Sequence, residues 1–246
     1  MNVRQYRPEI DGLRALSVLG VVFFHLGLSV PGGFVGVDVF FVISGYLITG
    51  ILLRNLREGR FSLVDFWARR VRRIAPAAVA MVLGTLALGG YLLTPAAFES
   101  LGRTLVAHVL FASNCYFSRD QGYFAESADA LPLLHTWSLA VEEQFYVIFP
   151  LVLLGVWKWR PRWVIPVMAG LAIWSLGWSY LKVQWNLKEA FFLLPPRGWE
   201  LLAGAILAGV PSLKLKPVMK EVLSGLGLAL IVVPMMSYGK ETVFPG

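Results

Sequence analysis

An arginine and a histidine share one strongly apolar stretch near the start of the chain, Arg14 to Gly27, which reads RALSVLGVVFFHLG. Arg14 and His25 are eleven positions apart, which in an α-helix is about 16 Å along the axis and about 20° from a whole number of turns. We therefore expect both residues on one helix face. An imidazole can act as a general base or a nucleophile, and a guanidinium binds anions such as phosphate.

These apolar surroundings leave two interpretations of the pair. Ionisable groups inside a membrane span usually face a cavity, the bundle interior or a partner, which favours a functional site. Alternatively, Arg14 extends to the membrane surface and His25 hydrogen-bonds a neighbouring helix. Asp38, at the start of the next apolar stretch, either orients the imidazole or caps its own helix. In that stretch we expect Ser44 and Gly45 to permit close helix packing rather than to supply a nucleophile.

Two adjacent carboxylates, Glu142 and Glu143, interrupt another apolar stretch, HTWSLAVEEQFYVIFPL. Neighbouring residues of a helix point about 100° apart, so at least one of the two should face other helices rather than lipid. We expect them in a polar network that serves function or holds the scaffold. The alternative is a buried salt bridge to Arg197 or Arg14. Arg197 and Glu200 can also pair with each other, because they are spaced i, i+3.

Four arginines gather in the segment FWARRVRRIAP, which we assign to a cytoplasmic loop. They are Arg69, Arg70, Arg72 and Arg73. Either i, i+3 pair, Arg69 with Arg72 or Arg70 with Arg73, can grip a phosphate through bidentate hydrogen bonds. Binding of anionic membrane lipid explains the cluster equally well. Arginine-rich cytoplasmic loops also set the topology of membrane proteins.

The composition indicates the kind of scaffold that positions these groups. The chain has 246 residues, of which 57% are hydrophobic and 15% charged, so we predict an all-α, polytopic integral membrane bundle. Seven spans are expected, at Ile10–Val30, Val37–Leu53, Ile74–Leu93, Trp137–Val156, Val164–Tyr180, Trp199–Val210 and Val222–Met236. The segment Leu101–Phe117 is predicted to be an interfacial or re-entrant helix.

The distribution of charge predicts the orientation of these spans. With the N-terminus in the cytoplasm, most of the 22 Lys and Arg residues fall on the cytoplasmic side, as the positive-inside pattern requires. The net charge of +7 is therefore explained by topology and does not indicate a nucleic-acid partner. The sequence has no phosphate-loop, paired-cysteine, HExxH or GxSxG motif, so we expect no metal and no tightly bound cofactor.

Five segments, taken in this order, resemble the bacterial membrane-bound acyltransferase-3 family. They are YRPEIDGLRALSVLGVVFFHLG, GGFVGVDVFFVISGYLITGIL, FWARRVRRIAP, HTWSLAVEEQFYVIFPL and RGWELLAGA. The family's Arg-X10-His pattern falls on Arg14 and His25. Its Arg-X-X-Arg pattern falls on the arginine cluster, where the doubled arginines leave two registers open.

The resemblance implies an O-acyltransferase of the bacterial cytoplasmic (inner) membrane. Acetyl-CoA would be the cytoplasmic donor substrate, and an extracytoplasmic envelope polysaccharide, such as lipopolysaccharide, or a lipid-linked sugar would be the acceptor. The arginine cluster would then hold the donor's phosphates, and Arg14 would steady the donor. His25 would act as a general base or carry the acyl group itself, with Asp38, Glu142 and Glu143 as further members of the catalytic site.

Two other expectations accompany this one. The resemblance implies that residues 1–246 are one transmembrane domain and that further helices follow it. The alternative functions are a transporter of an anionic or acylated substrate, against which no inverted repeat is visible, and a non-catalytic scaffold that binds lipid or a partner through its basic loop. A scaffold does not need the Arg14 and His25 pair.

Overall fold

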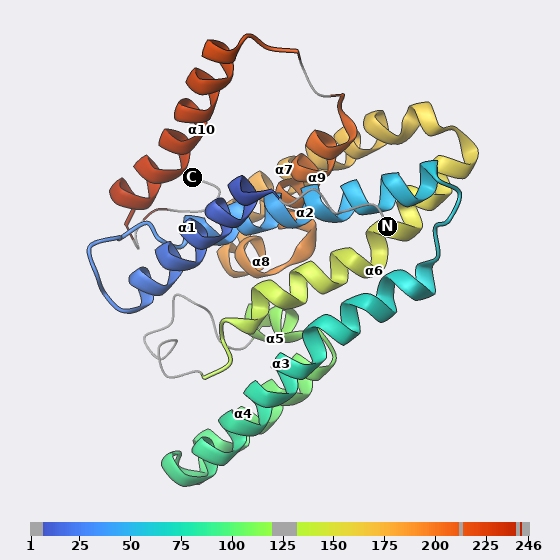
Figure 1. The fold of residues 1–246 in the computed structure, drawn as a ribbon. Coiled ribbons are helices and arrows are strands. Elements are labelled where there is room, and N and C mark those ends of the chain that lie inside the picture. Colours follow the sequence, from blue (N-terminus) through green and yellow to red (C-terminus); the bar gives the residue numbers. More distant parts are fainter. Residues whose placement is uncertain (1–6, 120–131, 212–213, 240–241, 243–246) are drawn as a thin grey trace. The chain divides into compact units, whose positions relative to one another are not determined.

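The computed structural model describes residues 7–119, 132–211, 214–239 and 242, and within these ranges it contains helices and no strands (Figure 1). This confirms the all-α prediction. The helices are α1 (Pro8–His25), α2 (Val35–Arg57), α3 (Leu63–Leu92), α4 (Pro95–Val109), α5 (Ser113–Arg119), α6 (Thr136–Trp159), α7 (Val164–Trp185), α8 (Leu187–Phe192), α9 (Leu194–Gly209) and α10 (Pro217–Ser237). A short 3-10 turn, Pro161–Trp163, joins α6 to α7.

Six helical segments of the described residues are long and apolar enough to cross a membrane. They are Val35–Arg57, Leu63–Leu92, Thr136–Trp159, Pro161–Trp185, Leu187–Gly209 and Pro217–Ser237. The seventh segment expected from the sequence is α1, which has 18 residues and includes Glu9, Asp11 and Arg14. Each residue of a helix adds about 1.5 Å, so α1 alone is shorter than a typical hydrocarbon core of about 30 Å.

The prediction that the first helix continues to Val30 was wrong, because a Schellman motif ends α1 at His25. Gly27 adopts a left-handed φ of +67°. Its amide donates to the Phe24 carbonyl (3.1 Å), and the Leu28 amide donates to the Phe23 carbonyl (2.9 Å). Both bonds are those that a glycine in this conformation makes beyond a helix end.

The arginine cluster was wrongly assigned to a loop before a helix that begins at Ile74. Helix α3 begins eleven residues earlier, at Leu63, so all four arginines are helical. Its N-cap is Ser62, whose hydroxyl accepts the Asp65 amide at 3.2 Å, and this satisfies one of the unpaired amides at the helix start. The helix continues through Pro76.

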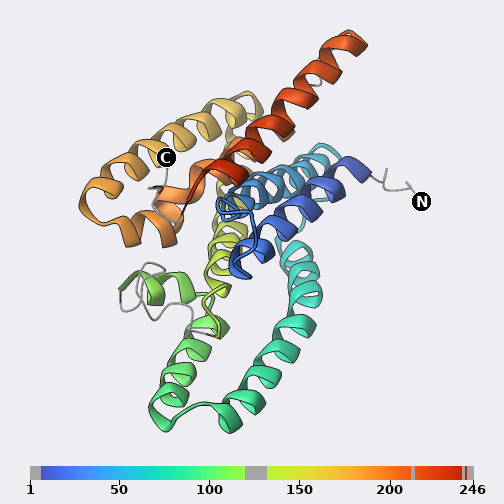
Figure 2. The same cartoon turned by 90° about the vertical axis from the view of Figure 1, so that its left-hand side faces the viewer.

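The single helix expected at Leu101–Phe117 is two helices, α4 and α5. Phe111, between them, has a φ of 50°, which breaks the right-handed helical path. Figures 1 and 2 show α3 and α4 joined in a helical hairpin. Leu101 and Leu105 of α4 are buried with Leu133, and side chains of α3 such as Leu86 pack against them.

The chain divides into two compact units. The first unit comprises Met1–Ile51 and Trp199–Gly246, and the second comprises Leu52–Gly198. In the first unit, backbones approach closely at glycines. A Cβ atom at Gly45 of α2 would collide with the Leu201 carbonyl of α9, and one at Gly204 of α9 would collide with the Val42 carbonyl of α2. The close packing expected at Gly45 is confirmed.

Aromatic side chains form much of the core of the second unit. Phe117 of α5 lies 6.2 Å from Phe192 of α8, between ring centroids. Trp137 of α6 lies 4.7 Å from Phe191 and 5.4 Å from Phe192. All four rings are buried, so aromatic packing holds α5, α6 and α8 together.

Candidate active site

His25 is the last residue of α1, and its side chain is exposed. Its Nδ1 atom lies 2.8 Å from the carbonyl oxygen of Val21. A carbonyl oxygen can only accept a hydrogen bond, so this contact requires the ring proton on Nδ1. In the neutral ring the lone pair then lies on Nε2, where a base or a nucleophile needs it. The edge of the Phe24 ring, 5.3 Å away between centroids, adds a lateral contact.

Arg14 lies in the same uninterrupted helix as His25, so the shared face expected from their spacing follows from the observed helix. The Arg14 side chain is half-buried, and its guanidinium lies 3.7 Å from Asp11 one turn earlier. Asp38 lies in the first turn of α2 and is half-buried. These residues all belong to the first unit.

Glycine contacts and a polar contact fix helix α1 against α2. A Cβ atom at Gly33 would collide with the Gly20 carbonyl, and one at Gly36 with the Ser17 carbonyl. Arg7 donates to the Tyr46 hydroxyl at 2.5 Å, with its guanidinium 5.6 Å from the ring centroid. Because these contacts occur along most of α1, they fix the relative placement of the two helices that carry His25 and Asp38.

The four arginines of α3, which belong to the second unit, lie in two different environments. Arg69, Arg72 and Arg73 are exposed, whereas Arg70 is half-buried. The Arg70 guanidinium lies over the Tyr146 ring of α6, 4.6 Å from its centroid, and 5.8 Å from that of Phe66. The three exposed arginines remain accessible to an anion.

Glu142 and Glu143 are half-buried in α6, which confirms that the pair does not simply face outward. The Tyr146 hydroxyl donates to Glu142 Oε2 at 3.3 Å. Glu143 Oε1 is buried and has no hydrogen-bond partner among the described residues. Tyr146 therefore contacts two of the predicted site residues, Arg70 through its ring and Glu142 through its hydroxyl.

An amide pair next to these carboxylates joins α5 to α6. Asn114 Nδ2 donates to Gln144 Oε1 at 3.2 Å, and Gln144 Nε2 donates to Asn114 Oδ1 at 2.8 Å. Gln144 Nε2 also donates to the carbonyl of Phe111, the residue at the break before α5, at 2.8 Å. Asn114 is fully buried. The sequence analysis missed this pair, although an asparagine and a glutamine in apolar segments were a visible signal.

Arg197 and Glu200, the other charged residues considered from the sequence, are both fully buried. The Arg197 guanidinium lies 5.4 Å from the ring centroids of both Trp137 and Phe191. Two aromatic faces therefore stabilise its charge.

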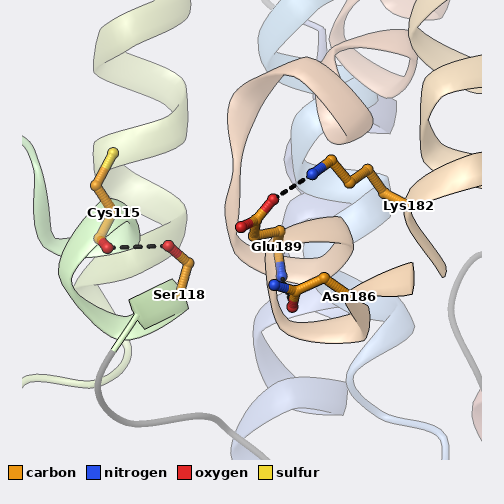
Figure 3. Close-up of polar contacts among 5 residues, drawn as sticks. All are labelled: Cys115, Ser118, Lys182, Asn186 and Glu189. Carbon is orange, nitrogen blue, oxygen red and sulfur yellow. Dashed lines mark hydrogen bonds and ion pairs between the residues drawn. The ribbon is translucent and has the colours of Figure 1, made fainter. Parts of the chain in front are cut away.

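The turn before α9 carries a second polar cluster that was not predicted (Figure 3). Lys182 of α7 pairs with Glu189 of α8 at 2.5 Å, and the Asn186 side chain caps α8 by accepting the Glu189 amide at 3.2 Å. In α5, Ser118 donates to the Cys115 carbonyl at 2.9 Å. Among the described residues, no group of three or more His, Cys, Asp or Glu side chains is placed to hold a metal ion.

A family model described as an acyltransferase domain matches residues 7–239 of the chain. The chain belongs to this acyltransferase family. The match covers the second unit, most of the first unit and every candidate site residue named above. The multi-pass helical architecture, with six potential spans in the described ranges, is therefore that of a chain from an acyltransferase family.

Curated relatives of this chain carry O-acetyltransferase names. The peptidoglycan O-acetyltransferase OatA of Listeria monocytogenes is 39% identical over 223 residues, which are 87% of this chain and 36% of that protein. The O-acetyltransferase OatA of Staphylococcus aureus is 37% identical over 210 residues, 83% of this chain and 34% of that protein. The chain thus spans little more than a third of the length of these two relatives. No solved structure matches it significantly.

Proposed function

We propose that the protein transfers an acyl group, most simply acetyl, from acetyl-CoA to a hydroxyl of an envelope polysaccharide outside the cytoplasmic membrane. The observation that carries this proposal is the state of His25. Its Nδ1 atom is engaged by the Val21 carbonyl, which puts the lone pair of the neutral ring on Nε2, on an exposed side chain. Membership of an acyltransferase family supplies the reaction type.

The reaction needs a base because a sugar hydroxyl is a weak nucleophile. In the direct route, His25 Nε2 takes the hydroxyl proton while the oxygen forms a bond to the acetyl carbonyl carbon. The carbon–sulfur bond of the thioester breaks, and the coenzyme thiolate leaves and takes up the proton from His25. In the relay route, Nε2 first attacks the carbonyl carbon, the carbon–sulfur bond breaks and the coenzyme leaves as a thiolate. The hydroxyl oxygen then attacks the acyl carbon, the bond from that carbon to Nε2 breaks, and the hydroxyl proton neutralises the thiolate.

The donor's phosphates would bind at the exposed arginines of α3. Guanidinium groups form bidentate hydrogen bonds with phosphate, and Arg69, Arg72 and Arg73 are exposed on one element. The positive-inside pattern supports a cytoplasmic location for them and for the N-terminus. Arg14 would contact the donor nearer to the reacting thioester.

The acceptor is proposed from the relatives. Because the Listeria relative is named for peptidoglycan, peptidoglycan is the first acceptor to test, ahead of lipopolysaccharide or a lipid-linked sugar. The reaction requires only a hydroxyl on the extracytoplasmic side of the membrane.

The test is to supply radiolabelled acetyl-CoA to membranes that contain the natural full-length protein and to identify the labelled product. Label in ester linkage to carbohydrate is the expected result. Label that crosses the membrane without esterification would overturn the proposal in favour of a carrier. Rapid denaturation at neutral pH within the first turnover separates the two routes, since only the relay leaves label on the protein, and His25→Ala should remove it.

A further inference from the structure

Helix α6 contains an internal proline, Pro150, next to which Trp67 of α3 makes a hydrogen bond. We infer that Trp67 is a positioning residue: it replaces the backbone amide that this proline lacks and thereby holds Tyr146 in place beside Glu142. The indole N–H of Trp67 donates to the Tyr146 carbonyl at 3.0 Å. The inference deepens the proposed function and rests on it for the reaction in which Glu142 takes part.

The Tyr146 carbonyl needs a hydrogen-bond donor from outside its own helix. In an α-helix the amide four residues further on donates to each carbonyl, and the residue four positions after Tyr146 is Pro150. Proline has no amide hydrogen and cannot make that bond. Both residues are buried, where a carbonyl without a donor is costly. The indole N–H of Trp67 supplies the missing donor.

The structure fixes Tyr146 at its backbone, its ring and its hydroxyl. Trp67 and Arg70 are spaced i, i+3 and therefore share a face of α3. Trp67 donates to the Tyr146 carbonyl, and the Arg70 guanidinium lies 4.6 Å from the centroid of the Tyr146 ring. The Tyr146 hydroxyl donates to Glu142 Oε2 at 3.3 Å. The direction of this hydroxyl therefore depends on where α3 lies against α6.

Few residues of α3 are covered, which makes the contact of Trp67 important. Among the described residues of α3, only Phe66 and Gly89 are buried. Gly89 lies at the opposite end of the helix, where its Cβ position is 2.8 Å from Leu101 of α4. Trp67 directly follows Phe66 and contacts α6 at Tyr146. Loss of this hydrogen bond should therefore loosen α3 from α6 and leave the packing of α3 on α4 intact.

The first test measures stability and does not depend on any transfer activity. Trp67→Phe removes the indole N–H but keeps an aromatic ring, and it should lower the thermal unfolding midpoint of the purified full-length protein by about 2 °C. In a Pro150→Ala background the restored amide can donate to the Tyr146 carbonyl. Trp67→Phe should then lower the midpoint by less than about 1 °C. Equal shifts in the two backgrounds would overturn the inference.

Pro76→Ala provides the matched control. Pro76 also lies inside a helix, α3, but an amide at this position faces the carbonyl of Arg72 and not that of Tyr146. In the Pro76→Ala background, Trp67→Phe should keep its full effect on the unfolding midpoint. If Pro76→Ala removed that effect as completely as Pro150→Ala does, the cause would be a general response to losing a helix proline, and the assignment of Trp67 to Pro150 would be wrong.

The second test asks whether Trp67 acts through the Tyr146 hydroxyl. In membranes that contain the full-length protein, Trp67→Phe should lower kcat for transfer from acetyl-CoA about fivefold and change the donor KM less than about twofold. Tyr146→Phe removes the hydroxyl that contacts Glu142, so in this background Trp67→Phe should lower kcat no further. A full fivefold loss in the Tyr146→Phe background would contradict the positioning role.

Failure of the inference can be distinguished from failure of the proposed function. If the unaltered protein transfers no acyl group from acetyl-CoA, the proposed function fails, and the stability measurements still decide whether Trp67 replaces the amide missing at Pro150. If transfer occurs but the effects of Trp67→Phe and Pro150→Ala on the unfolding midpoint are additive, the proposed function stands and the inference about Trp67 fails.

Discussion

The two units of the molecule hold their polar residues in different ways. In the first unit, His25 is oriented by backbone groups, namely the Val21 carbonyl and the Schellman motif at Gly27. In the second unit, side chains hold the charged groups, as Tyr146 holds Arg70 and Glu142. The exposed imidazole and the half-buried ions therefore depend on different parts of the sequence.

The difference follows from what each group has to do. A base or nucleophile must be accessible to its substrate, so it has to be oriented without being covered. Backbone hydrogen bonds and close helix contacts at glycines achieve this. A partly buried ion needs polarisable or oppositely charged neighbours, because its desolvation is otherwise costly. Mutations should therefore act through backbone crowding in the first unit and through unsatisfied polar groups in the second.

The largest expected effect on stability is that of Gly45→Ala in the first unit. Its Cβ atom would collide with the Leu201 carbonyl, so α2 and α9 must separate, at a cost of about 3 kcal/mol in the free energy of unfolding. Gly50→Ala, in the same helix but with nothing within 4 Å of its Cβ position, is the matched control and should be neutral or slightly stabilising. Denaturant unfolding of the two variants measures the difference; equal stabilities would contradict the close helix contact.

In the second unit, Asn114→Ala should cost about 2 kcal/mol, because it leaves a part-buried amide of Gln144 without its reciprocal partner. The double variant Asn114→Leu/Gln144→Leu removes both polar groups and should lose less stability than the sum of the two single substitutions. Denaturant unfolding of the unaltered protein, the two single leucine variants and the double variant tests this. Strict additivity would mean that the amide pair does not join α5 to α6.

Tyr46→Phe tests the contact between Tyr46 of α2 and Arg7, the N-cap residue of α1, in the first unit. It removes the hydroxyl that accepts from Arg7 and keeps the ring under the guanidinium, so the expected loss is about 1 kcal/mol. Tyr46→Leu, which also removes the ring, should lose more. If Tyr46→Phe were as destabilising as Gly45→Ala, side chains rather than glycine contacts would fix the first unit.

The smallest effect concerns His108 of α4, in the second unit. Burial lowers the pKa of His108 below its ordinary value of 6.5, so the unfolded chain binds a proton more readily than the folded one. The free energy of unfolding should therefore fall as the pH drops below about 6.5 and level off below the folded-state pKa. His108→Leu should abolish this component in unfolding curves recorded across that range, whereas substituting the exposed His135 should leave it in place.

The sequence was sufficient for the helical class, for the shared face of Arg14 and His25, and for close packing at Gly45, because each depends on helical period or residue size. The local signals at Gly27 and Ser62 were also present. The signal at Gly27 was overlooked because the hydrophobic stretch continues beyond this glycine. The signal at Ser62 was overlooked because the arginine-rich segment that follows it resembles a loop.

The polar residues Asn114 and Gln144 stood out in their apolar segments, but neither their pairing with each other nor the separate environment of Arg70 could have been predicted. Whether an arginine is buried depends on which face of α3 meets α6, and the contact with Tyr146 joins residues far apart in the sequence. The amide pair likewise joins two helices, α5 and α6, that are not continuous in the sequence. Helical period identifies which residues share a face but not which neighbour covers that face.

The account depends most directly on His25 as the group that activates the acceptor hydroxyl or carries the acyl group. Transfer of labelled acetyl from acetyl-CoA to carbohydrate should be measured side by side in membranes that contain equal amounts of the unaltered full-length protein and of His25→Ala. We predict that the substitution lowers transfer at least about a hundredfold and leaves membrane insertion intact. Transfer by His25→Ala at the rate of the unaltered protein would contradict the account.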